Sequence, residues 1–457
     1  MSKILLIRPF SKIPITNFPL GLMYIASSLE KAGHEVKILD LRFKDSGMGD
    51  INKALNDFIP DTVGIGAMTT EDAGLRKCLQ VINESKIEKP MIVVGGPHAS
   101  TYYREILKYP GVDCVVFGEG EMTMRDLVDK RCFDGIKGVA YNKGDGTCVV
   151  NPPREFIPDL DDVPYPAYHL LDVERYFKNP FVHGFVLSNQ RHAQIMSSRG
   201  CPYHCVFCHC VFGKKFRKRS PENVVGEIKF LHEKYGVNEI HFEDDSFNVD
   251  RVRAEGIFDL IIKSGMKIKI SFPNGLRADL LDEKIILKMK TAGVYQVSIG
   301  IESADPDIQK TIGKDIDLEK VGRSAQIMSR NGIITNGFFM LGFLDETEEQ
   351  MLRTIRFAAA SPLHLATIHK VNPFPGTVLG EQAKNRGYNI DIRDFGEDGY
   401  RFGKINISAV SQQTLDKMQK KAYLYFYLNC IRLWRVFWLT PNKTTLFKHF
   451  FRLVFWR

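Results

Sequence analysis

Hydrophobic positions in the first 150 residues follow two alternating patterns. The short apolar runs, each closed by turn residues, are KILLIRP, HEVKILDL, TVGIGAM, MIVVGGPH and VDCVVFGEGE. Between them lie longer stretches whose apolar residues have helical spacing, such as 21–33 and 74–85. Strands that alternate with helices of this length predict an α/β domain with a doubly wound, Rossmann-like, mainly parallel sheet over residues 1–150.

The same alternation returns between residues 190 and 380. AQIMSS predicts a strand that leads into a cysteine-rich loop, and residues 220–236 predict a helix with Pro221 near its start and Gly236 at its end. Further strand-and-loop units are NEIHFEDDSFN, KISFPNGLRADLL, VYQVSIGIESAD, GIITNGFFMLGFLDET and LATIHKVNPFPGT. About six such units predict a partial TIM barrel, a fold that places its chemistry at the carboxyl ends of its strands.

Two segments fall outside these patterns. Residues 151–189 are rich in proline and acidic side chains and predict a linker between the domains. Residues 381–457 predict a helical carboxyl-terminal extension, in which 422–439 is apolar and aromatic but contains Arg432 and Arg435. Two internal arginines argue against a membrane-spanning helix. The segment fits either a helix in a membrane interface or a helix that covers the barrel or the substrate.

The composition is that of a globular protein. The chain has 457 residues, of which 44% are hydrophobic and 25% charged, and its nine cysteines are scattered rather than arranged as a disulfide framework. The apolar start is too short for a signal peptide, so we expect a reducing, cytoplasmic location, with peripheral membrane contact through the carboxyl-terminal helices as an added option.

A formal net charge of +8 raises the question of a nucleic-acid partner. Part of this charge lies in the basic run 214–219, directly after the cysteine-rich loop. The run fits either a solvated loop or the steering of an anionic substrate or cofactor. The charge balance alone does not decide between them.

The main candidate for chemistry is Cys201, Cys205 and Cys208, spaced C-x3-C-x2-C. Three thiolates this close can hold three corners of a 4Fe–4S cluster and leave the fourth iron open to a small molecule. Cys210 and His209 also permit a structural zinc site, although zinc patterns usually divide their ligands into two separated pairs. The spacing therefore favours the cluster.

This cysteine motif, with Phe207 before its last cysteine, resembles the radical S-adenosylmethionine superfamily. The resemblance implies that the open iron binds the amino and carboxylate groups of S-adenosylmethionine, and that one electron cleaves it to a 5′-deoxyadenosyl radical. Later strand ends match the superfamily in order. They imply that an acid among Glu243, Asp244 and Asp245 contacts the methionine amino group, and that the other cofactor-binding positions are Arg277, Gly300, Glu302, Ser303, Gly342, Glu346 and the turn Pro373, Pro375, Gly376 and Thr377.

Turns at the predicted strand ends of residues 1–150 resemble the cobalamin-binding domain found upstream of one radical S-adenosylmethionine class. Ligands of such sheets bind beyond the carboxyl ends of the strands, where glycines allow close backbone approach. The Asp-x-His-x-x-Gly signature is absent, so cobalamin binding rests on the resemblance. His98 fits either a residue facing the corrin or a satisfied loop histidine. The candidate cobalamin-binding residues are Pro19, Gly21, Thr69, Gly95, Gly96, His98, Gly118, Glu119 and Gly120.

Taken together, the resemblance implies a cobalamin-dependent radical S-adenosylmethionine enzyme, similar to the class B methyltransferases and the anaerobic magnesium-protoporphyrin cyclases. It implies methylation of an unactivated carbon of a hydrophobic or natural-product substrate, with an external electron donor such as flavodoxin or ferredoxin. The alternatives are oxidative cyclisation or carbon–carbon coupling of a tetrapyrrole or lipid, and an amino-terminal domain that serves only as a scaffold. A zinc or iron–sulfur protein that binds nucleic acid is a distant alternative, because strand-end carboxylates would repel phosphate.

Overall fold

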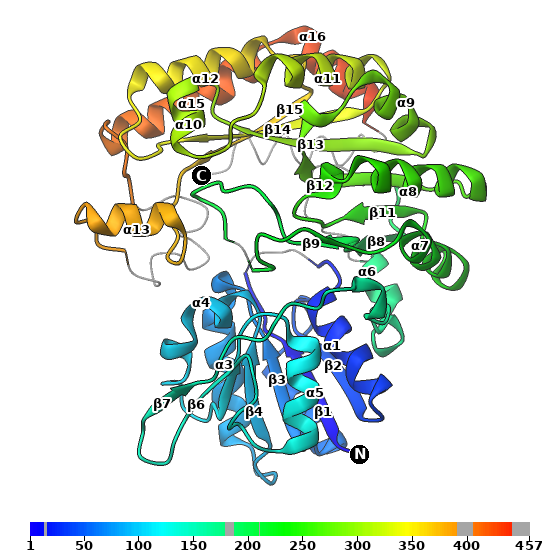
Figure 1. The fold of residues 1–457 in the computed structure, drawn as a ribbon, viewed down its shortest axis with the longest axis vertical. Coiled ribbons are helices and arrows are strands. Elements are labelled where there is room, and N and C mark those ends of the chain that lie inside the picture. The colour runs from blue at the N-terminus through cyan, green and yellow to red at the C-terminus, as the bar shows by residue number, and fades with distance from the viewer. Residues whose placement is uncertain (13–15, 179–186, 210, 391–404, 441–457) are drawn as a thin grey trace. The chain divides into compact units, whose positions relative to one another are not determined.

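The computed structural model describes residues 1–12, 16–178, 187–209, 211–390 and 405–440. These residues form two compact units (Figure 1), one containing the described residues up to 178 and the other those from 187 onward. Cys210 and residues 441–457, which include the aromatic and basic end of the chain, lie outside the described residues.

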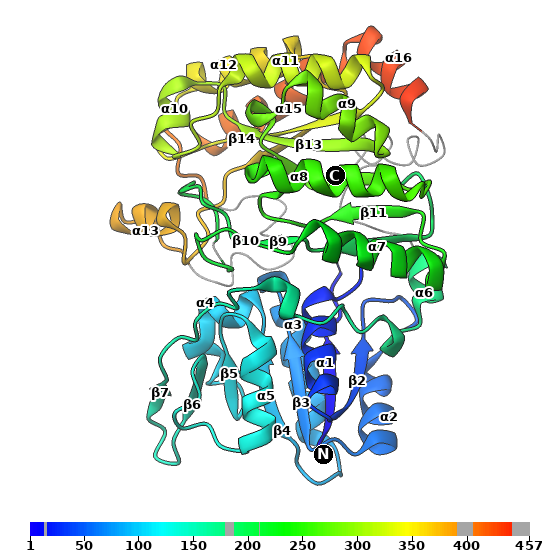
Figure 2. The same cartoon turned by 45° about the vertical axis from the view of Figure 1, so that its right-hand side comes forward.

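The first unit contains a seven-stranded sheet in the order β2-β1-β3-β4-β5-β6-β7 (Figure 2). Strands β1 to β5 pair in parallel, whereas β6 and β7 add an antiparallel edge. The strand order reverses between β1 and β3, where a doubly wound sheet opens a crevice for ligands. The strands are β1 (Lys3–Arg8), β2 (Glu35–Asp40), β3 (Thr62–Gly66), β4 (Met91–Gly95), β5 (Cys114–Val116), β6 (Val139–Asn142) and β7 (Cys148–Val150).

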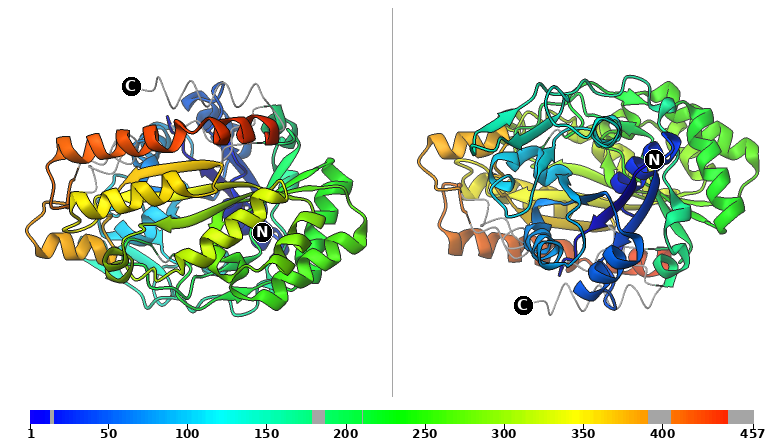
Figure 3. Two further views of the ribbon diagram at one scale, coloured as in Figure 1. Left: turned by 90° about the horizontal axis from the view of Figure 1, so that it is seen from above. Right: turned by 90° about the horizontal axis from the view of Figure 1, so that it is seen from below.

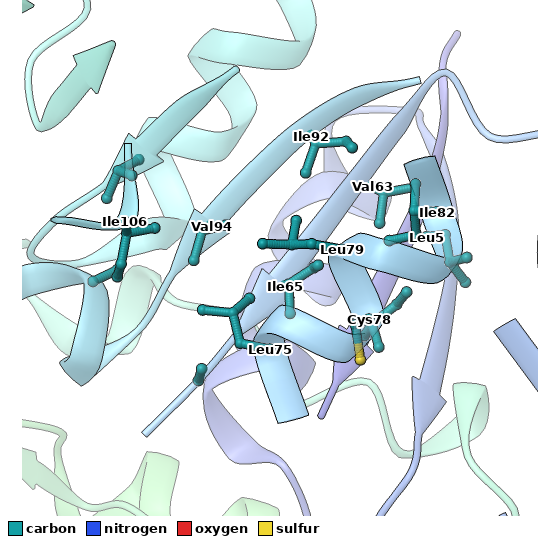
Figure 4. Close-up of a cluster of buried hydrophobic side chains, with 14 of the residues drawn as sticks. Leu5, Val63, Ile65, Leu75, Cys78, Leu79, Ile82, Ile92, Val94 and Ile106 are labelled. Carbon is teal, nitrogen blue, oxygen red and sulfur yellow. The ribbon is translucent and has the colours of Figure 1, made fainter. Parts of the chain in front are cut away.

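Helices pack on both faces of this sheet. Figure 4 shows one of the two cores, in which Leu75, Cys78 and Leu79 of α3 pack against Ile65 of β3 and Ile92 of β4. Burial on both faces explains why the strands are apolar almost throughout. The predicted doubly wound sheet is therefore confirmed. The main helices are α1 (Leu20–Lys31), α2 (Met48–Phe58), α3 (Asp72–Glu84), α4 (Pro97–Ile106) and α5 (Gly120–Lys130).

The predicted linker begins as a packed part of the first unit. Residues 151–178 belong to this unit and end in α6 (Val173–Lys178). The Tyr176 hydroxyl donates to Asp40 Oδ2 at 2.6 Å, and its ring stacks on Phe18 at 4.4 Å between centroids. These contacts fix the segment against the end of β2.

The second unit contains a six-stranded parallel sheet in the order β15-β14-β13-β12-β11-β8. Each strand pairs with the next in sequence, which is the connectivity of a partial barrel and confirms the predicted fold class. The strands are β8 (His192–Ile195), β11 (Glu239–Phe242), β12 (Lys269–Leu276), β13 (Val294–Glu302), β14 (Ile334–Leu341) and β15 (Leu365–Lys370), and a separate antiparallel pair is β9 (Ser198–Arg199) and β10 (Arg217–Lys218).

Helices alternate with these strands. The predicted helix 220–236 is α7 (Pro221–Tyr235), because the Ser220 side chain accepts from the backbone of Asn223 and Gly236 ends the helix at φ +64°. The others are α8 (Arg251–Ser264), α9 (Glu283–Thr291), α10 (Pro306–Thr311), α11 (Leu318–Arg330), α12 (Glu348–Ala360) and α13 (Val378–Asn385).

The apolar segment 422–439 is divided between two helices, α15 (Gln412–Tyr427) and α16 (Cys430–Leu439). The chain breaks at Asn429, whose side chain accepts from the backbone N–H of Arg432 and begins α16. Helix α15 packs on α12 and β15, and both helices run along the outside of the second unit (Figure 3). No helix in the described part of the chain is long and apolar enough to cross a membrane.

The contacts of Arg432 favour the alternative in which this segment is a helix that covers the barrel. Its side chain is buried and donates to the carbonyls of Leu363 at 3.0 Å, Ala359 at 2.9 Å and Ser361 at 2.8 Å, and also to that of Phe426. These carbonyls lie at or just beyond the carboxyl ends of α12 and α15, where the partial negative charge of a helix favours a cation. One arginine thus joins the ends of two helices.

Candidate functional site

The three candidate cysteines lie on one loop after β9, beyond the carboxyl end of β8. Gly200 begins this loop at φ +83°, and a Cβ there would lie 2.4 Å from the carbonyl oxygen of Lys215. The backbone of Val206 donates to Ile312 and accepts from Leu379, at 3.0 and 2.9 Å. The loop is therefore packed against its own later residues near Lys215, against the end of α10 and against the start of α13.

The neighbouring Cys208 thiol, together with nearby cations, lowers the pKa of Cys205 to about 6, while the pKa of Cys208 is raised. Burial raises the pKa of Cys201. Within the described ranges no three His, Cys, Asp or Glu side chains converge closely enough to hold a metal ion. The fit to a 4Fe–4S cluster therefore rests on the donor chemistry of three thiols on one fixed loop.

Lys314 supplies positive charge beside this loop, and the sequence analysis missed it. Its ammonium lies 3.2 Å from Glu302 Oε1. Burial alone would lower its pKa, but Glu302, Cys205 and Cys208 raise it above the ordinary value. The preceding Gly313 brings this segment against the loop, because a Cβ there would lie 2.9 Å from the carbonyl oxygen of His204.

Arg277, a predicted cofactor-binding residue, lies on the same side of the site. Its guanidinium is 4.3 Å from the ring centroid of Tyr203 within the cysteine loop, and it pairs with Asp279 at 2.7 Å. It also donates to the carbonyl of Lys314 at 3.0 Å. Two cations therefore face the thiols, and both stabilise Cys205 as a thiolate.

Glu302 adopts a backbone conformation that is rare outside glycine, with φ +66° at the end of β13. A Cβ on Gly300 would lie 2.8 Å from both Glu302 Oε1 and Lys314 Nζ, so glycine leaves room for this ion pair. Strain of this kind occurs at sites where a side chain must point in a set direction. Ser303, by contrast, is fully buried and its hydroxyl bonds Thr354 at 3.1 Å, which indicates a structural position.

The acids at the end of β11 divide into two kinds. Asp244 is buried and accepts from the Ser197 hydroxyl at 2.7 Å and from the Ser198 hydroxyl. Its oxygens join β11 to the strand before the cysteine loop. Asp245 is exposed and accepts from the Gly200 N–H, and its negative charge helps to raise the pKa of Cys201. The geometry thus favours Asp245 and the half-buried Glu243 over Asp244 for contact with a cationic group.

Gly342 and Glu346 form a closed turn at the end of β14. Glu346 Oε2 accepts from the backbone N–H groups of Gly342 and Phe343 at 2.6 and 3.0 Å. Burial of this carboxyl nevertheless raises its pKa to about 7. Phe207 packs in the same region, 5.7 Å from the ring of Phe343.

The basic run 214–219 is largely engaged in internal contacts. Arg217 and Arg219 are buried, and Arg219 pairs with Glu227. Lys218 pairs with Asp250, and Lys214 Nζ donates to the carbonyl of Tyr203 at 2.5 Å. The run mainly stabilises the cysteine loop and does not form a free basic surface.

In the first unit, the predicted cobalamin-binding residues lie in turns that follow successive strands. Gly96 (φ +94°) and Gly118 (φ +80°) follow β4 and β5, and Thr69 follows β3. A Cβ on Gly96 would lie 2.9 Å from the carbonyl oxygen of Ala67, so these two turns meet. Pro19 and Gly21 begin α1, Gly120 begins α5, and the buried carboxylate of Glu119 accepts from Ile157 N–H at 2.8 Å.

His98 is buried in a hydrogen-bond network through Nε2, while its Nδ1 has no hydrogen-bond partner among the described residues. Its side chain has no exposed surface, and Nε2 lies 3.1 Å from Asp72 Oδ1. Tyr109 donates to the same carboxylate oxygen at 2.8 Å, and Arg76 bonds both Asp72 and Tyr109. This network joins α3 to α4.

Comparison with known proteins gives two family matches for this chain. Residues 11–128 match the B12 binding domain and residues 195–358 the Radical SAM superfamily. An uncharacterized methyltransferase of Pyrococcus horikoshii is 36% identical, covering 93% of this chain and 92% of its own length. The cytidylyl-2-hydroxyethylphosphonate methyltransferase of Streptomyces wedmorensis is 28% identical, over 89% and 86% of the two chains.

The anaerobic magnesium-protoporphyrin IX monomethyl ester cyclase of Rubrivivax gelatinosus is 27% identical, over 90% of this chain and 74% of the cyclase. Among solved structures, OxsB with aqua-cobalamin and S-adenosylmethionine bound has a TM-score of 0.76 at 19% identity, covering 99% of this chain and 75% of OxsB. At that identity the likeness concerns the fold.

Proposed function

This chain belongs to the radical S-adenosylmethionine enzymes that carry an amino-terminal cobalamin-binding domain, and from that premise we propose that it methylates an unactivated carbon of a hydrophobic or natural-product substrate. Its cofactors are a 4Fe–4S cluster, S-adenosylmethionine and cobalamin, which together supply one-electron chemistry and a methyl group. The observation that carries the proposal is the 36% identity to an uncharacterized methyltransferase along nearly the whole of both chains, together with the 28% identity to the cytidylyl-2-hydroxyethylphosphonate methyltransferase.

The chain's own residues take defined roles in this proposal. The thiols of Cys201, Cys205 and Cys208 hold the cluster, and the ammonium of Lys314 and the guanidinium of Arg277 balance its negative charge. In this proposal the carboxylates of Asp245 and Glu243 bind the ammonium of S-adenosylmethionine, and Glu302 accepts a hydrogen bond from a hydroxyl. Cobalamin is held by turns of the first unit, which contain Pro19, Gly21, Thr69, Gly95, Gly96, Gly118, Glu119 and Gly120.

A second outcome of the same apparatus is oxidative cyclisation or carbon–carbon coupling. It is supported by the cyclase relative, which matches 90% of this chain.

The proposal also includes an external one-electron donor of the flavodoxin or ferredoxin class, because reduction of the cluster needs an electron that the small-molecule substrate does not supply.

The first experiment measures iron, sulfide and cobalamin in protein reconstituted without oxygen, with Cys205→Ala as the cluster control. About four irons and one cobalamin per chain are expected for the wild type. The variant should lose iron and keep cobalamin, because the two sites lie in different units. Iron without cobalamin in the wild type would refute methyl transfer through cobalt.

Product analysis then separates the two outcomes. Methyl transfer converts S-adenosylmethionine to S-adenosylhomocysteine as well as to 5′-deoxyadenosine, whereas cyclisation yields 5′-deoxyadenosine without S-adenosylhomocysteine. Substrate-dependent formation of both products is expected. Formation of 5′-deoxyadenosine alone would favour the cyclase.

We also propose that the chain makes peripheral contact with a membrane surface through α15 and α16. The support is a row of exposed apolar side chains, with exposed fractions from 37% for Leu433 to 73% for Leu428. The other members of this row are Leu424, Tyr425, Ile431, Trp434 and Trp438. Exposed apolar and aromatic side chains interspersed with lysine and arginine are typical of a helix that lies in a membrane interface.

A further inference from the structure

A cavity of about 550 Å³ lies beside α16, at the amino-terminal end of β15. The cysteine loop follows the opposite, carboxyl ends of the strands, so this cavity is separate from the candidate catalytic site. It is formed by the middle of α11, by the turn between α12 and β15, and by the first turns of α16. Its polar side chains are Arg323, Gln326, Ser361, His364, Asn429, Arg432 and Arg435.

Every charged group that lines the cavity is a cation, and the lining includes no Asp or Glu in the described part of the chain. Arg435 is exposed and makes no hydrogen bond or ion pair with any described residue. Arg432 is bonded only to backbone carbonyls, so no carboxylate neutralises it. Arg323 pairs with Glu319 of its own helix at the rim. Excess positive charge therefore remains in the cavity, which fits an anionic occupant.

His364 does not add to this charge. Burial and the nearby Arg435 and Arg432 lower its pKa to about 4, so its ring is neutral at physiological pH. Its Nδ1 accepts from the backbone N–H of Thr335 at 3.1 Å, and its Nε2 lies 3.2 Å from the Ser329 hydroxyl. The anion-binding capacity thus comes from the arginines.

The cavity borders the exposed apolar row described above. Ile431 and Arg435 are four residues apart and therefore share one side of α16, which faces the cavity. Trp434 and Trp438 share the adjacent exposed side, with their rings 5.6 Å apart. One helix therefore presents a cation at the rim of a cavity and two large indoles next to it. Indole rings prefer the boundary between polar headgroups and acyl chains.

The charge distribution along the sequence points to an anionic surface. Residues 417–457 contain nine Lys and Arg and no Asp or Glu, whereas the whole chain has 62 Lys and Arg and 54 Asp and Glu. The first 416 residues therefore carry a formal charge of −1, and the final segment carries more than the entire excess of +8. All three tryptophans of the chain, at 434, 438 and 456, also lie in this segment.

We infer that this cavity binds the phosphate of an anionic phospholipid headgroup while the side chains of Trp434, Trp438 and Leu433 lie among the upper acyl chains. The inference rests on the proposed membrane contact and gives it a lipid chemistry and a site. Arg435 binds the phosphate, because it is the arginine of the cavity without a protein partner. A cation near an anionic lipid surface contributes about 1 kcal/mol to binding, which corresponds to roughly a fivefold change in affinity.

The test measures binding of the full-length, cofactor-loaded protein to two kinds of vesicle, one of phosphatidylcholine alone and one of phosphatidylcholine mixed with phosphatidylglycerol. The variants are Arg435→Gln and, as a control of equal charge loss, Lys420→Gln, an exposed lysine of α15 that does not line the cavity. Wild-type protein should prefer the anionic vesicles. Loss of one cation near the surface should weaken binding by up to roughly fivefold. Arg435→Gln should weaken it more than Lys420→Gln, because it removes the phosphate site as well as a charge.

Each other result overturns a defined part of the inference. Equal binding to both vesicles would leave membrane contact standing and remove the anion site. Equal effects of the two variants would show a general charge effect in place of the cavity. Thermal stabilisation by inorganic phosphate, with no vesicle binding, would assign the cavity to a free anion. Absence of all binding would overturn both the site and the membrane contact, without bearing on methyl transfer.

Discussion

At the scale of single residues, the site is organised by charges that meet across long stretches of sequence. Lys314 and Glu302 form an ion pair next to the cysteine loop, and Gly300 leaves the space for it. A buried cation near an iron–sulfur cluster stabilises the more negative, reduced state. We therefore expect Lys314 to ease reduction of the cluster and to hold Glu302 in place.

Lys314→Met should lower the midpoint potential of the reconstituted cluster, and Lys314→Arg should largely preserve it. A tenfold change in the reduction equilibrium corresponds to about 59 mV for a one-electron couple. Redox titration followed by electron paramagnetic resonance measures the shift at unchanged iron content. An unaltered potential in the Met variant would limit Lys314 to positioning Glu302.

Glu346 should make stability depend on pH. Its pKa is raised from 4.5 to about 7 in the folded protein. Its contribution to the free energy of unfolding is therefore fully present below about pH 4.5 and is lost as the pH rises through 7. The free energy of unfolding of the wild type should fall by about 2 kcal/mol through this group between about pH 5.5 and 8. Glu346→Gln, which mimics the protonated carboxyl, should remove that dependence in urea unfolding at the two pH values. Parallel pH profiles for both proteins would contradict the assignment.

At the scale of elements, the carboxyl-terminal helices are attached to the barrel by Arg432. The guanidinium binds carbonyls at the ends of α12 and α15, and burial lowers its pKa to about 10. Removal of the guanidinium would leave these buried carbonyl acceptors without the donor that compensates for their loss of solvation.

Arg432→Met should destabilise the second unit by about 3 kcal/mol, the order expected for charge-assisted hydrogen bonds to buried carbonyls. Arg435→Gln is the matched control on the same helix, because its side chain is exposed and should leave the free energy of unfolding unchanged. Denaturant unfolding of both variants measures the difference. Equal stability of the two would mean that α16 is held by its apolar contacts alone.

At the scale of the whole molecule, each of the two α/β units matches a different cofactor-binding family. The net positive charge of the chain comes from residues 417–457. Residues 11–128 match the B12 binding domain and residues 195–358 the Radical SAM superfamily. The basic, aromatic segment follows both matches in sequence. This order separates the residues for chemistry from those proposed to bind a lipid surface.

The amino-acid sequence by itself determined the two α/β patterns, the cysteine motif and the family, because hydrophobic period and ligand spacing are local properties of a chain. It also placed the helix 220–236 correctly, since its capping residues are contiguous with it. Only the tertiary structure decided which strand-end residues face the site. In the folded chain Asp244 is buried and accepts a hydrogen bond from Ser197, whereas Asp245 is exposed.

Tertiary structure also buried His98 against Asp72 and brought Lys314 to the cysteine loop, more than one hundred residues away in sequence. The break at Asn429 and the burial of Arg432 were likewise invisible in a continuous apolar segment. The physical reason is the same in each case. The direction of a side chain at a strand end, and the partner of a buried charge, are set by packing between segments that are distant in the sequence.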